Sequence, residues 1–237
     1  MRLFHRFVTP AFVGAIFLCS QANASLIFPV GITDVSSQFT GREAIHSVDG
    51  SGLDSSNPPN HGVNPNGTMW LTVGNGEDCL CAADPDIALG QLAHITFSLG
   101  GTFMVDSFRV WNYNENGSNP FTNRGVQNLT ISTSLSSGGP FTALTNPGTG
   151  TTTWTFDQAP GLATYTGQVI TFSTPVNAAY IRFDIKTNWG LEAVANDQDN
   201  YVGLAEVQFD AVPEPGPLAL TCAGFLALAA GKRLVKR

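Results

Sequence analysis

The sequence has few charged residues, and basic residues are especially scarce in its long central segment, residues 25–211. Charged residues make up 12% of the 237 residues. Between residues 25 and 211, five basic residues stand against seventeen acidic ones, a net charge of −12. The five cations are Arg42, Arg109, Arg124, Arg182 and Lys186. Such an acidic segment repels phosphate backbones, which argues against a nucleic-acid partner, and it suits divalent cations held by oxygen ligands.

The sequence also lacks the local motifs of common catalytic sites. It has no Gly-x-Ser-x-Gly elbow, no His-Glu-x-x-His helix and no phosphate-binding loop. A glycosidase needs two carboxyl groups about 5–9.5 Å apart. The acidic residues here fall mostly in loops, such as 77–86 and 192–199, which indicates solvation or ion binding. We therefore expect a protein that is not an enzyme, with a glycan-active enzyme as the less favoured alternative.

Cysteine is scarce, and between the two ends of the chain only Cys79 and Cys81 remain. An oxidising compartment favours a disulfide between them. The single residue between the cysteines makes a small, strained ring that is easily reduced. Two free thiols, or half of a metal site completed by His61 or His94, are the alternatives. A zinc site normally shows a second ligand pair at a definite spacing, and none is visible.

Long apolar runs are confined to the ends of the chain. At the N-terminus a basic opening (2–6) precedes a short apolar core (12–18). The Ala-Asn-Ala at 22–24 fits the small-x-small pattern of a signal-peptidase site. We expect residues 1–24 to be a signal peptide that is cleaved after Ala24, which implies export by the general secretory route.

The C-terminus combines a proline-containing segment that interrupts regular structure, an apolar run and basic residues. The proline-containing segment consists of Val212, Pro213, Glu214 and Pro215. The apolar run 218–230 is too short to cross about 30 Å of hydrocarbon. The longer stretch 216–235 suffices as a transmembrane segment if Lys232 and Arg233 extend to the headgroups, on the cytoplasmic side. A plain C-terminal anchor behind a proline-rich linker is the alternative.

This tail, residues 212–237, resembles the PEP-CTERM sorting signal of Gram-negative bacteria. The resemblance implies recognition by an exosortase, a membrane-embedded cysteine protease, with cleavage near the Pro-Glu-Pro. It also implies a transient inner-membrane anchor, followed by release to the cell surface or the extracellular matrix.

Residues 25–211 have a size typical of one domain, and strand signals dominate them. Around residue 183, for example, Ile181, Phe183 and Ile185 share one face, and charged residues share the other. Such alternation is typical of an antiparallel sheet with one buried face. The expected strands are 91–99, 103–105, 107–113, 128–133, 151–156, 169–172, 180–185 and 202–209. The sequence therefore predicts an all-β fold, an antiparallel jelly-roll β-sandwich, between the signal peptide and a C-terminal hydrophobic sorting helix.

Several segments of this region together carry a family resemblance. They are 48–52 with 69–70, then 95–100, 108–115, 125–132, 180–183 and 202–207. From about residue 34 to residue 210 the chain resembles the discoidin, or coagulation-factor type C, group of galactose-binding-like β-sandwiches. The resemblance implies an eight-stranded antiparallel jelly roll that binds carbohydrate or other surface ligands, with Trp70 in its core.

The resemblance also implies a structural calcium ion held by Asp49 and Glu206. Carboxylate and backbone oxygens suit this hard cation, and Gly50 and Gly52 allow carbonyl groups to turn inward. In the alternative interpretation, Asp49 caps a turn and Glu206 lies on a solvated strand face.

Two stretches run off strands into loops and place aromatic rings beside amides, with an arginine as a further candidate. The candidate ligand-binding residues are Trp111, Asn112, Tyr113, Asn114, Arg124, Asn188 and Trp189. Rings stack on the C–H faces of sugars, and amides pair with hydroxyls. In the alternative interpretation the aromatics fill the ends of the sandwich and the asparagines make turns.

The sequence as a whole predicts an exported, surface- or matrix-associated module that binds extracellular polysaccharide or a cell-surface glycan. The alternative is a structural adhesion or biofilm-matrix protein without a sugar pocket.

Overall fold

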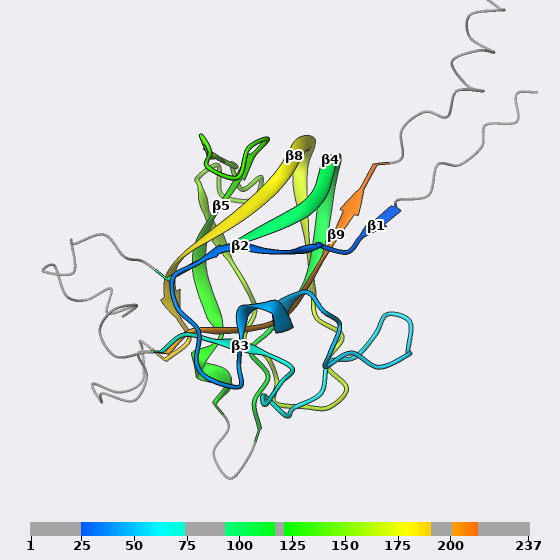
Figure 1. Ribbon diagram of the computed structural model, residues 1–237, viewed down its shortest axis with the longest axis vertical. Coiled ribbons are helices and arrows are strands. Elements are labelled where there is room, and N and C mark those ends of the chain that lie inside the picture. The colour runs from blue at the N-terminus through cyan, green and yellow to red at the C-terminus, as the bar shows by residue number, and fades with distance from the viewer. Residues whose placement is uncertain (1–24, 74–92, 117–120, 191–200, 213–237) are drawn as a thin grey trace, which may run out of the picture.

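The computed structural model describes residues 25–73, 93–116, 121–190 and 201–212, which form a two-layered antiparallel β-sandwich (Figure 1). The strands are β1 (Ser25–Ile27), β2 (Gly31–Val35), β3 (Trp70–Leu71), β4 (His94–Asn112), β5 (Val126–Ser134), β6 (Thr142–Ala143), β7 (Thr153–Thr155), β8 (Gln168–Asn188) and β9 (Gly203–Ala211). Within these residues the helical pieces are the short 3-10 turns η1 (Ala44–Ser47) and η3 (Thr122–Arg124). The all-β expectation is confirmed.

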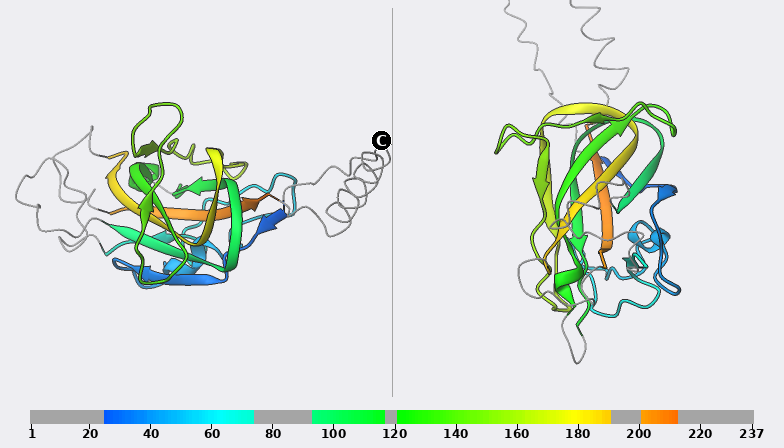
Figure 2. Two further views of the ribbon diagram at one scale, coloured as in Figure 1. Left: turned by 90° about the horizontal axis from the view of Figure 1, so that it is seen from above. Right: turned by 90° about the vertical axis from the view of Figure 1, so that its left-hand side faces the viewer.

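Two unusually long strands, β4 and β8, build both layers. The first part of β4 pairs with the second part of β8 through Ile95 and Phe183, and the second part of β4 pairs with the first part of β8 through Phe108 and Ile170. Both strands curve strongly as they pass from one layer to the other (Figure 2). Strands β2, β5 and β7 extend the first layer, and β9 with β1 and β3 extends the second.

Phenylalanine rings fill the space between the two layers. The ring centroid of Phe108 lies 5.5 Å from that of Phe183 and 5.6 Å from that of Phe209. Phe97 also meets Phe183, at 5.0 Å and an interplanar angle of 70°. Edge-on and tilted contacts of this kind are the favoured geometries between aromatic rings. The inward positions of the strands thus form one aromatic core, which also contains the fully buried Trp70, as expected.

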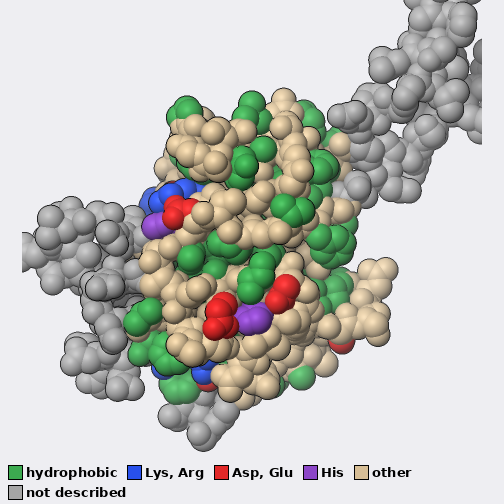
Figure 3. All heavy atoms as spheres, in the orientation of Figure 1, with side chains coloured by type: hydrophobic (Ala, Val, Ile, Leu, Met, Phe, Trp, Pro, Cys, Tyr) green, Lys and Arg blue, Asp and Glu red, His purple; other side chains and the backbone are tan. Residues whose placement is uncertain are grey.

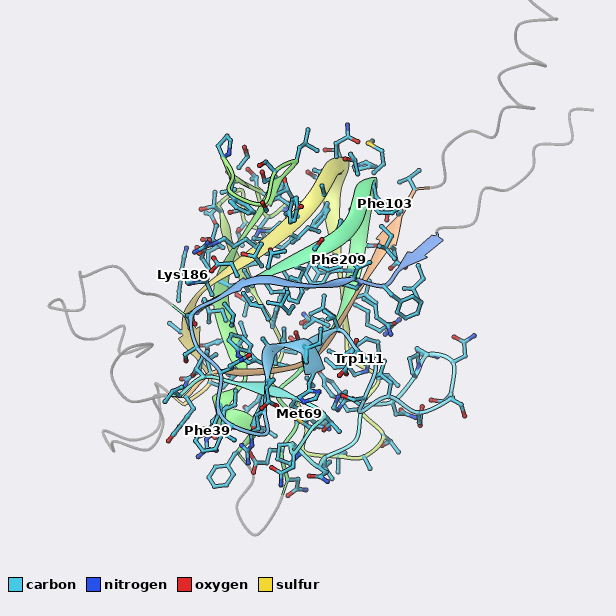
Figure 4. The ribbon with its side chains drawn as sticks, in the orientation of Figure 1. Phe39, Met69, Phe103, Trp111, Lys186 and Phe209 are labelled. Carbon is cyan, nitrogen blue, oxygen red and sulfur yellow. The ribbon has the colours of Figure 1, made fainter. Side chains whose placement is uncertain are left out.

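The outer face of the second layer carries a separate hydrophobic cluster. It contains Met69, Leu71, Trp111, Tyr113 and Ala205, all buried. In Figure 4, Trp111 and Met69 lie near the middle of the molecule, whereas Phe39 lies near its edge. The loop that precedes β3 lies against this cluster: Trp111 donates its indole N–H to the carbonyl of Pro59 at 3.3 Å, and Leu53 packs against the cluster. Side chains on both faces of the second part of β4 are therefore buried, Val110 in the core between the layers and Trp111 in the outer cluster.

The expected strands overlap the described strands, but 107–113, 151–156 and 202–209 each extend beyond the strand observed there, and 169–172 and 180–185 are both parts of β8. Residues 91–92 lie outside the described residues, and the isolated segments 103–105 and 107–113 are parts of one continuous strand, β4. Strands β1, β2, β3 and β6 were not expected, because β3 and β6 have only two residues each and β1 and β2 are short and half-exposed, with little apolar alternation. The predicted signal peptide, both cysteines, and the sorting motif beyond Val212 lie outside the described residues. No helix among the residues that the structure describes is long and apolar enough to cross a membrane.

Candidate functional site

The termini and the longest loops lie at opposite ends of the sandwich. Both ends of the described chain leave beside β1 and β9, at the upper right of Figure 1. The loops around η1, β3 and η3 gather at the opposite end. Most of the residues expected to bind a ligand belong to this loop end, because β4 finishes there and β9 starts there.

Asn112 holds the end of β4 to neighbouring segments through its side-chain amide. The amide nitrogen donates to the carbonyl oxygens of Val126 (2.7 Å) and Asp157 (2.9 Å). The amide oxygen accepts from the backbone N–H groups of Tyr113 (2.9 Å) and Val126 (2.8 Å). The side chain is fully buried, and a Cβ atom at Gly125 would lie 2.8 Å from its oxygen. All four hydrogen-bonding positions of the amide are therefore used inside the protein.

Asn114 acts in the same way, two residues further along. Its amide nitrogen lies 3.3, 3.1 and 2.8 Å from the carbonyl oxygens of His61, Gly62 and Leu162. Its amide oxygen accepts from the N–H of Gly161 at 2.9 Å. The residue thus joins three separate loops at a buried point. We call Asn112 and Asn114 the asparagine staples.

The remaining predicted residues around Trp189 also have partners within the protein. Trp189 is half-buried and donates its indole N–H to the carbonyl of Phe156 at 3.2 Å. Asn188 is buried; it donates to the carbonyl of Tyr201 at 2.8 Å and accepts from Gly190 at 3.1 Å. A direct contact between any of the predicted residues and a ligand stays a prediction.

Charged side chains converge at the loop end around Glu115. Arg42 lies 3.1 and 3.4 Å from its two carboxylate oxygens, and Arg124 lies 3.7 Å from one of them. Tyr113 donates its hydroxyl to Glu115 at 2.6 Å and accepts from Arg42 at 2.5 Å. Burial and the neighbouring carboxylate raise the pKa of Tyr113, so the phenol stays protonated. Two guanidinium groups are therefore fixed around one carboxylate.

Aromatic rings surround the two arginines. The guanidinium carbon of Arg124 lies 3.9 Å from the ring centre of Phe121 and 4.8 Å from that of Tyr201. That of Arg42 lies 5.9 Å from the ring centre of Phe39, which meets Tyr201 edge-on at 6.4 Å. Cation–π contacts at these distances hold the guanidinium groups in place. Phe39 is 42% exposed, so one ring of the group faces solvent.

We call this group the Arg–aromatic cluster. It consists of Phe39, Arg42, Glu115, Phe121, Arg124 and Tyr201. Of these six residues, only Arg124 was expected to bind a ligand. Glu115 directly follows the predicted Asn114 and Phe121 lies three residues before Arg124, whereas Phe39, Arg42 and Tyr201 come from segments to which no sequence signal pointed.

A second candidate site lies where the loop after η1 meets β9. Glu206 is fully buried; one carboxylate oxygen accepts from the N–H of Gly50 at 3.1 Å, and the other has no hydrogen-bond partner. Burial, reinforced by the nearby charge of Asp49, raises the pKa of Glu206 to about 8. The alternative interpretation, in which Glu206 lies on a solvated strand face, is therefore wrong. Its companion, Asp49 as a turn cap, agrees with the hydrogen bond from the N–H of Ser51 at 2.9 Å.

The donor set around Glu206 fits a calcium ion. It offers an unpartnered carboxylate oxygen and the nearby carboxylate of Asp49, whose oxygens also meet His46 and the N–H of Ser51, each at 2.9 Å. Gly50 adopts a φ of 71°, which permits a tight turn of the backbone there. Oxygen atoms of this kind are the ligands that calcium prefers. Among the described residues no group of three or more His, Cys, Asp and Glu side chains could hold a metal ion, so hydroxyl and carbonyl oxygens would complete the set.

The two histidines considered as partners of the cysteines have other contacts. The ring nitrogens of His61 lie 2.9 and 3.1 Å from the carbonyl oxygens of Gly62 and Thr68. Burial lowers the pKa of His61. His94 lies 3.2 Å from a carboxylate oxygen of Asp34.

No protein-family model matches the chain, and no curated protein sequence matches it. Several solved structures are similar. A family 32 carbohydrate-binding module (CBM) from Clostridium perfringens NanJ, in complex with galactose, is 18% identical over 79% of this chain and 99% of its own, with a TM-score of 0.49. CpGH89CBM32-5 from Clostridium perfringens, in complex with GalNAc-β-1,3-galactose, is 14% identical over 78% of this chain and 99% of its own, with a TM-score of 0.48. CBM32-3 from a family 31 glycoside hydrolase of Clostridium perfringens is 19% identical over 76% of this chain and 90% of its own, with a TM-score of 0.45. At these identities and scores the function has to be argued from the chain's own residues.

The raised pKa of Glu206 predicts how stability depends on pH. Between about pH 4.5 and pH 8 the folded protein keeps a proton on Glu206 that the unfolded chain has released. In the presence of a chelator the free energy of unfolding should therefore fall as the pH rises through this range, by on the order of a few kcal/mol. Urea unfolding at a series of pH values measures this slope.

Glu206→Gln should flatten the slope, because the amide does not titrate. Glu43→Gln is the matched control, because the pKa of Glu43 is lowered by hydrogen bonds from backbone N–H groups and its proton is released below this range. An unchanged slope in Glu206→Gln would show that the carboxyl group is not buried as described.

Proposed function

We propose that this chain is an exported, non-catalytic carbohydrate-binding protein of the cell surface or extracellular matrix, and that it binds glycans through the Arg–aromatic cluster. Sugar recognition combines a ring that stacks on C–H groups with fixed donors that meet hydroxyls. The exposed ring of Phe39 and the guanidinium groups of Arg42 and Arg124 offer both.

The observation that carries this proposal is the fixed geometry of the two guanidinium groups. Arg42 is held by both oxygens of Glu115, and Arg124 is held at 3.9 Å from the ring centre of Phe121. Their side chains are only 16% and 11% exposed, so most of their rotamer freedom is already lost before any ligand arrives. Preorganised donors lose less entropy on binding, which favours recognition over a role in solvation alone.

The same cluster argues for binding rather than catalysis. Its one carboxylate, Glu115, is shared by two arginines and the hydroxyl of Tyr113. These partners occupy the carboxylate, so it is not free to contact a substrate. The two-carboxyl mechanism of glycoside hydrolysis also needs a second carboxyl group about 5–9.5 Å away, and the cluster contains none.

A second candidate function is a structural adhesion or biofilm-matrix protein without a sugar pocket. The asparagine staples favour it, because their amides are fully used by backbone groups. Trp111, another predicted sugar contact, is fully buried beneath a loop. In this second candidate function, the hydrogen bonds at the loop end only stabilise the fold, and attachment relies on packing between proteins.

We further propose that calcium binds at Asp49 and Glu206 and fixes the loop after η1. An ionised Glu206 would be an isolated buried charge without a cation, and a divalent ion would offset that cost. Calcium would then stabilise the loop end without taking part in any chemical step.

Export and sorting complete the proposal. The signal-peptide pattern of residues 1–24 and the PEP-CTERM-like tail of residues 212–237 support passage through the inner membrane of a Gram-negative bacterium. An exosortase would then remove the tail near Pro213, Glu214 and Pro215, and release the sandwich at the cell surface.

Glycan binding is tested with a glycan array and with the exopolysaccharide of the producing bacterium. Phe39→Ala should weaken binding about tenfold, because it removes a stacking ring worth roughly 1 kcal/mol or more. Leu162→Ala, at another exposed apolar side chain, should leave the affinity unchanged. Titration calorimetry gives the affinity, and thermal unfolding shows that both variants remain folded. Absence of binding to the array and to the exopolysaccharide would favour the structural candidate.

Calcium binding is tested by thermal unfolding in calcium and in chelator. At a calcium concentration about 100 times its Kd, the ion should add ~2.7 kcal/mol of stability. The melting temperature should therefore rise by several degrees at pH 8, and Asp49→Asn should reduce the rise. Equal melting temperatures with calcium and with chelator would contradict the calcium proposal and leave the glycan proposal intact.

Sorting is tested by mass spectrometry of the mature protein from its host. The expected product begins at Ser25 and ends near Pro215. Replacement of Pro213, Glu214 and Pro215 by alanine should leave the tail attached, whereas replacement of Pro58 and Pro59, in a different loop, should not. Full-length protein in the soluble intracellular fraction would overturn the export proposal.

A further inference from the structure

Large apolar side chains are exposed at the end of the sandwich where the tail begins. They are Leu26, Phe28, Val30, Met104 and Val212, each between 36% and 69% exposed. We call them the apolar strip. Figure 3 shows hydrophobic side chains over the region of β1 and β2 on the face in view. Contiguous exposed apolar surface commonly marks an interaction site.

The backbone pattern shows why these side chains point outward. Along β1 and the residues after it, Ile27 is buried in the core, whereas Leu26 and Phe28 on either side are exposed. Val30 continues this alternation, and a Cβ atom on Gly100 would lie 2.7 Å from its side chain. The outward positions of a solvated edge strand normally carry polar residues. Here three successive outward positions, Leu26, Phe28 and Val30, are apolar, which indicates that this surface contacts a partner.

The sheet brings the other two members to the same end. The N–H of Val212 donates to the carbonyl of Met104 at 2.7 Å, which sets these two residues side by side. Ala211, the residue before Val212, pairs with Ser25 at the start of β1. Leu26, Met104 and Val212 therefore lie together at the end of β9, where the described chain ends.

Charge narrows the choice of partner. Leu26 is paired with Asp210, and Ser107 donates to carboxylate oxygens of Asp106 and Asp210 at 3.1 and 3.3 Å. Two carboxyl groups therefore lie close to the strip. A partner that carries dense negative charge would be repelled there, so the chemistry favours an apolar or zwitterionic surface.

The chain that follows Val212 identifies such a surface. Only residues 213–217 separate it from the apolar run 218–230. Five residues span at most about 17 Å even when fully extended, and three prolines make this connection stiff. While the apolar run lies in a bilayer, the strip therefore stays within reach of the lipid headgroups.

We propose that the apolar strip rests on the membrane surface while the tail is inserted, and so orients the sandwich with its loop end away from the membrane. This inference rests on the proposed membrane insertion of the tail. Interfacial binding of this kind grows with the apolar area that is buried. The contact is weak without the tail, because the strip then has to find the membrane from solution, and it ends when the tail is removed.

Oxidation of Met104 reports this contact directly. The full chain is reconstituted in phosphatidylcholine vesicles at a low ratio of protein to lipid, and methionine sulfoxide is measured by mass spectrometry after brief hydroxyl-radical exposure. Met104 should oxidise several-fold more slowly than in a Leu26→Ser/Phe28→Ser/Val30→Ser variant treated in the same way. Met69, which is fully buried, serves as the internal control for folding.

Two further variants serve as a milder substitution within the apolar strip and as a control outside it. Val30→Ser alone, at the most exposed member of the strip, should give a partial loss of protection if the triple variant does not fold. Leu135→Ser/Leu162→Ser, at exposed apolar residues outside the strip, should keep the full protection. Phosphatidylglycerol added to the vesicles should not increase it, because the strip is flanked by carboxyl groups.

Vesicle flotation separates this inference from the one on which it rests. Chain that floats with the vesicles while Met104 oxidises as fast as in the strip variants would overturn the membrane contact and leave the inserted tail in place. Chain that does not float would overturn both. Protection that appears only at high protein density would show that a second copy of the chain covers the strip, which also overturns the proposal.

Discussion

The loop end of this protein depends on two buried side-chain amides. Asn112 and Asn114 lie two residues apart at the end of β4 and bind backbone groups at four other places in the chain, namely Val126, Asp157, His61–Gly62 and Leu162. A loop cannot hydrogen-bond to a neighbouring strand ladder, so it needs such local partners to keep one conformation. Glu115 comes directly after the second staple. Its position, and with it that of the Arg–aromatic cluster, is therefore set by amides that never need to meet a ligand.

The sparse basic residues are placed unevenly. Two of the five in the sandwich, Arg42 and Arg124, share one carboxylate at the loop end, whereas the opposite end presents apolar side chains beside Asp106 and Asp210. This polarity gives the two ends different chemistry. One end offers fixed donors and rings, and the other offers a surface compatible with uncharged lipid. The segment 25–211, which contains both ends, carries a net charge of −12.

Sequence periodicity could predict much of the fold, because the side-chain faces of a strand are a local property. The alternation at Ile181, Phe183 and Ile185 matches their complete burial. The burial of Trp111 could not be predicted in this way, because its cover comes from a loop about fifty residues earlier in the chain. The same holds for the Arg–aromatic cluster, whose members come from separate loops and meet only through the tertiary structure. The chemistry of Asn112 and Asn114 was visible in the sequence, whereas their partners were set by long-range contacts.

The orientation of β9 has a mechanical consequence. This strand starts beside Tyr201 at the loop end and finishes beside Val212, from which the tail departs, and it lies between β1 and β4. A pull on Val212 against the loop end would run along the strand axis. Every hydrogen bond that joins β9 to its neighbours would then be sheared at once, instead of opening one after another from an end. Tension along β9 is therefore resisted by all of these hydrogen bonds together.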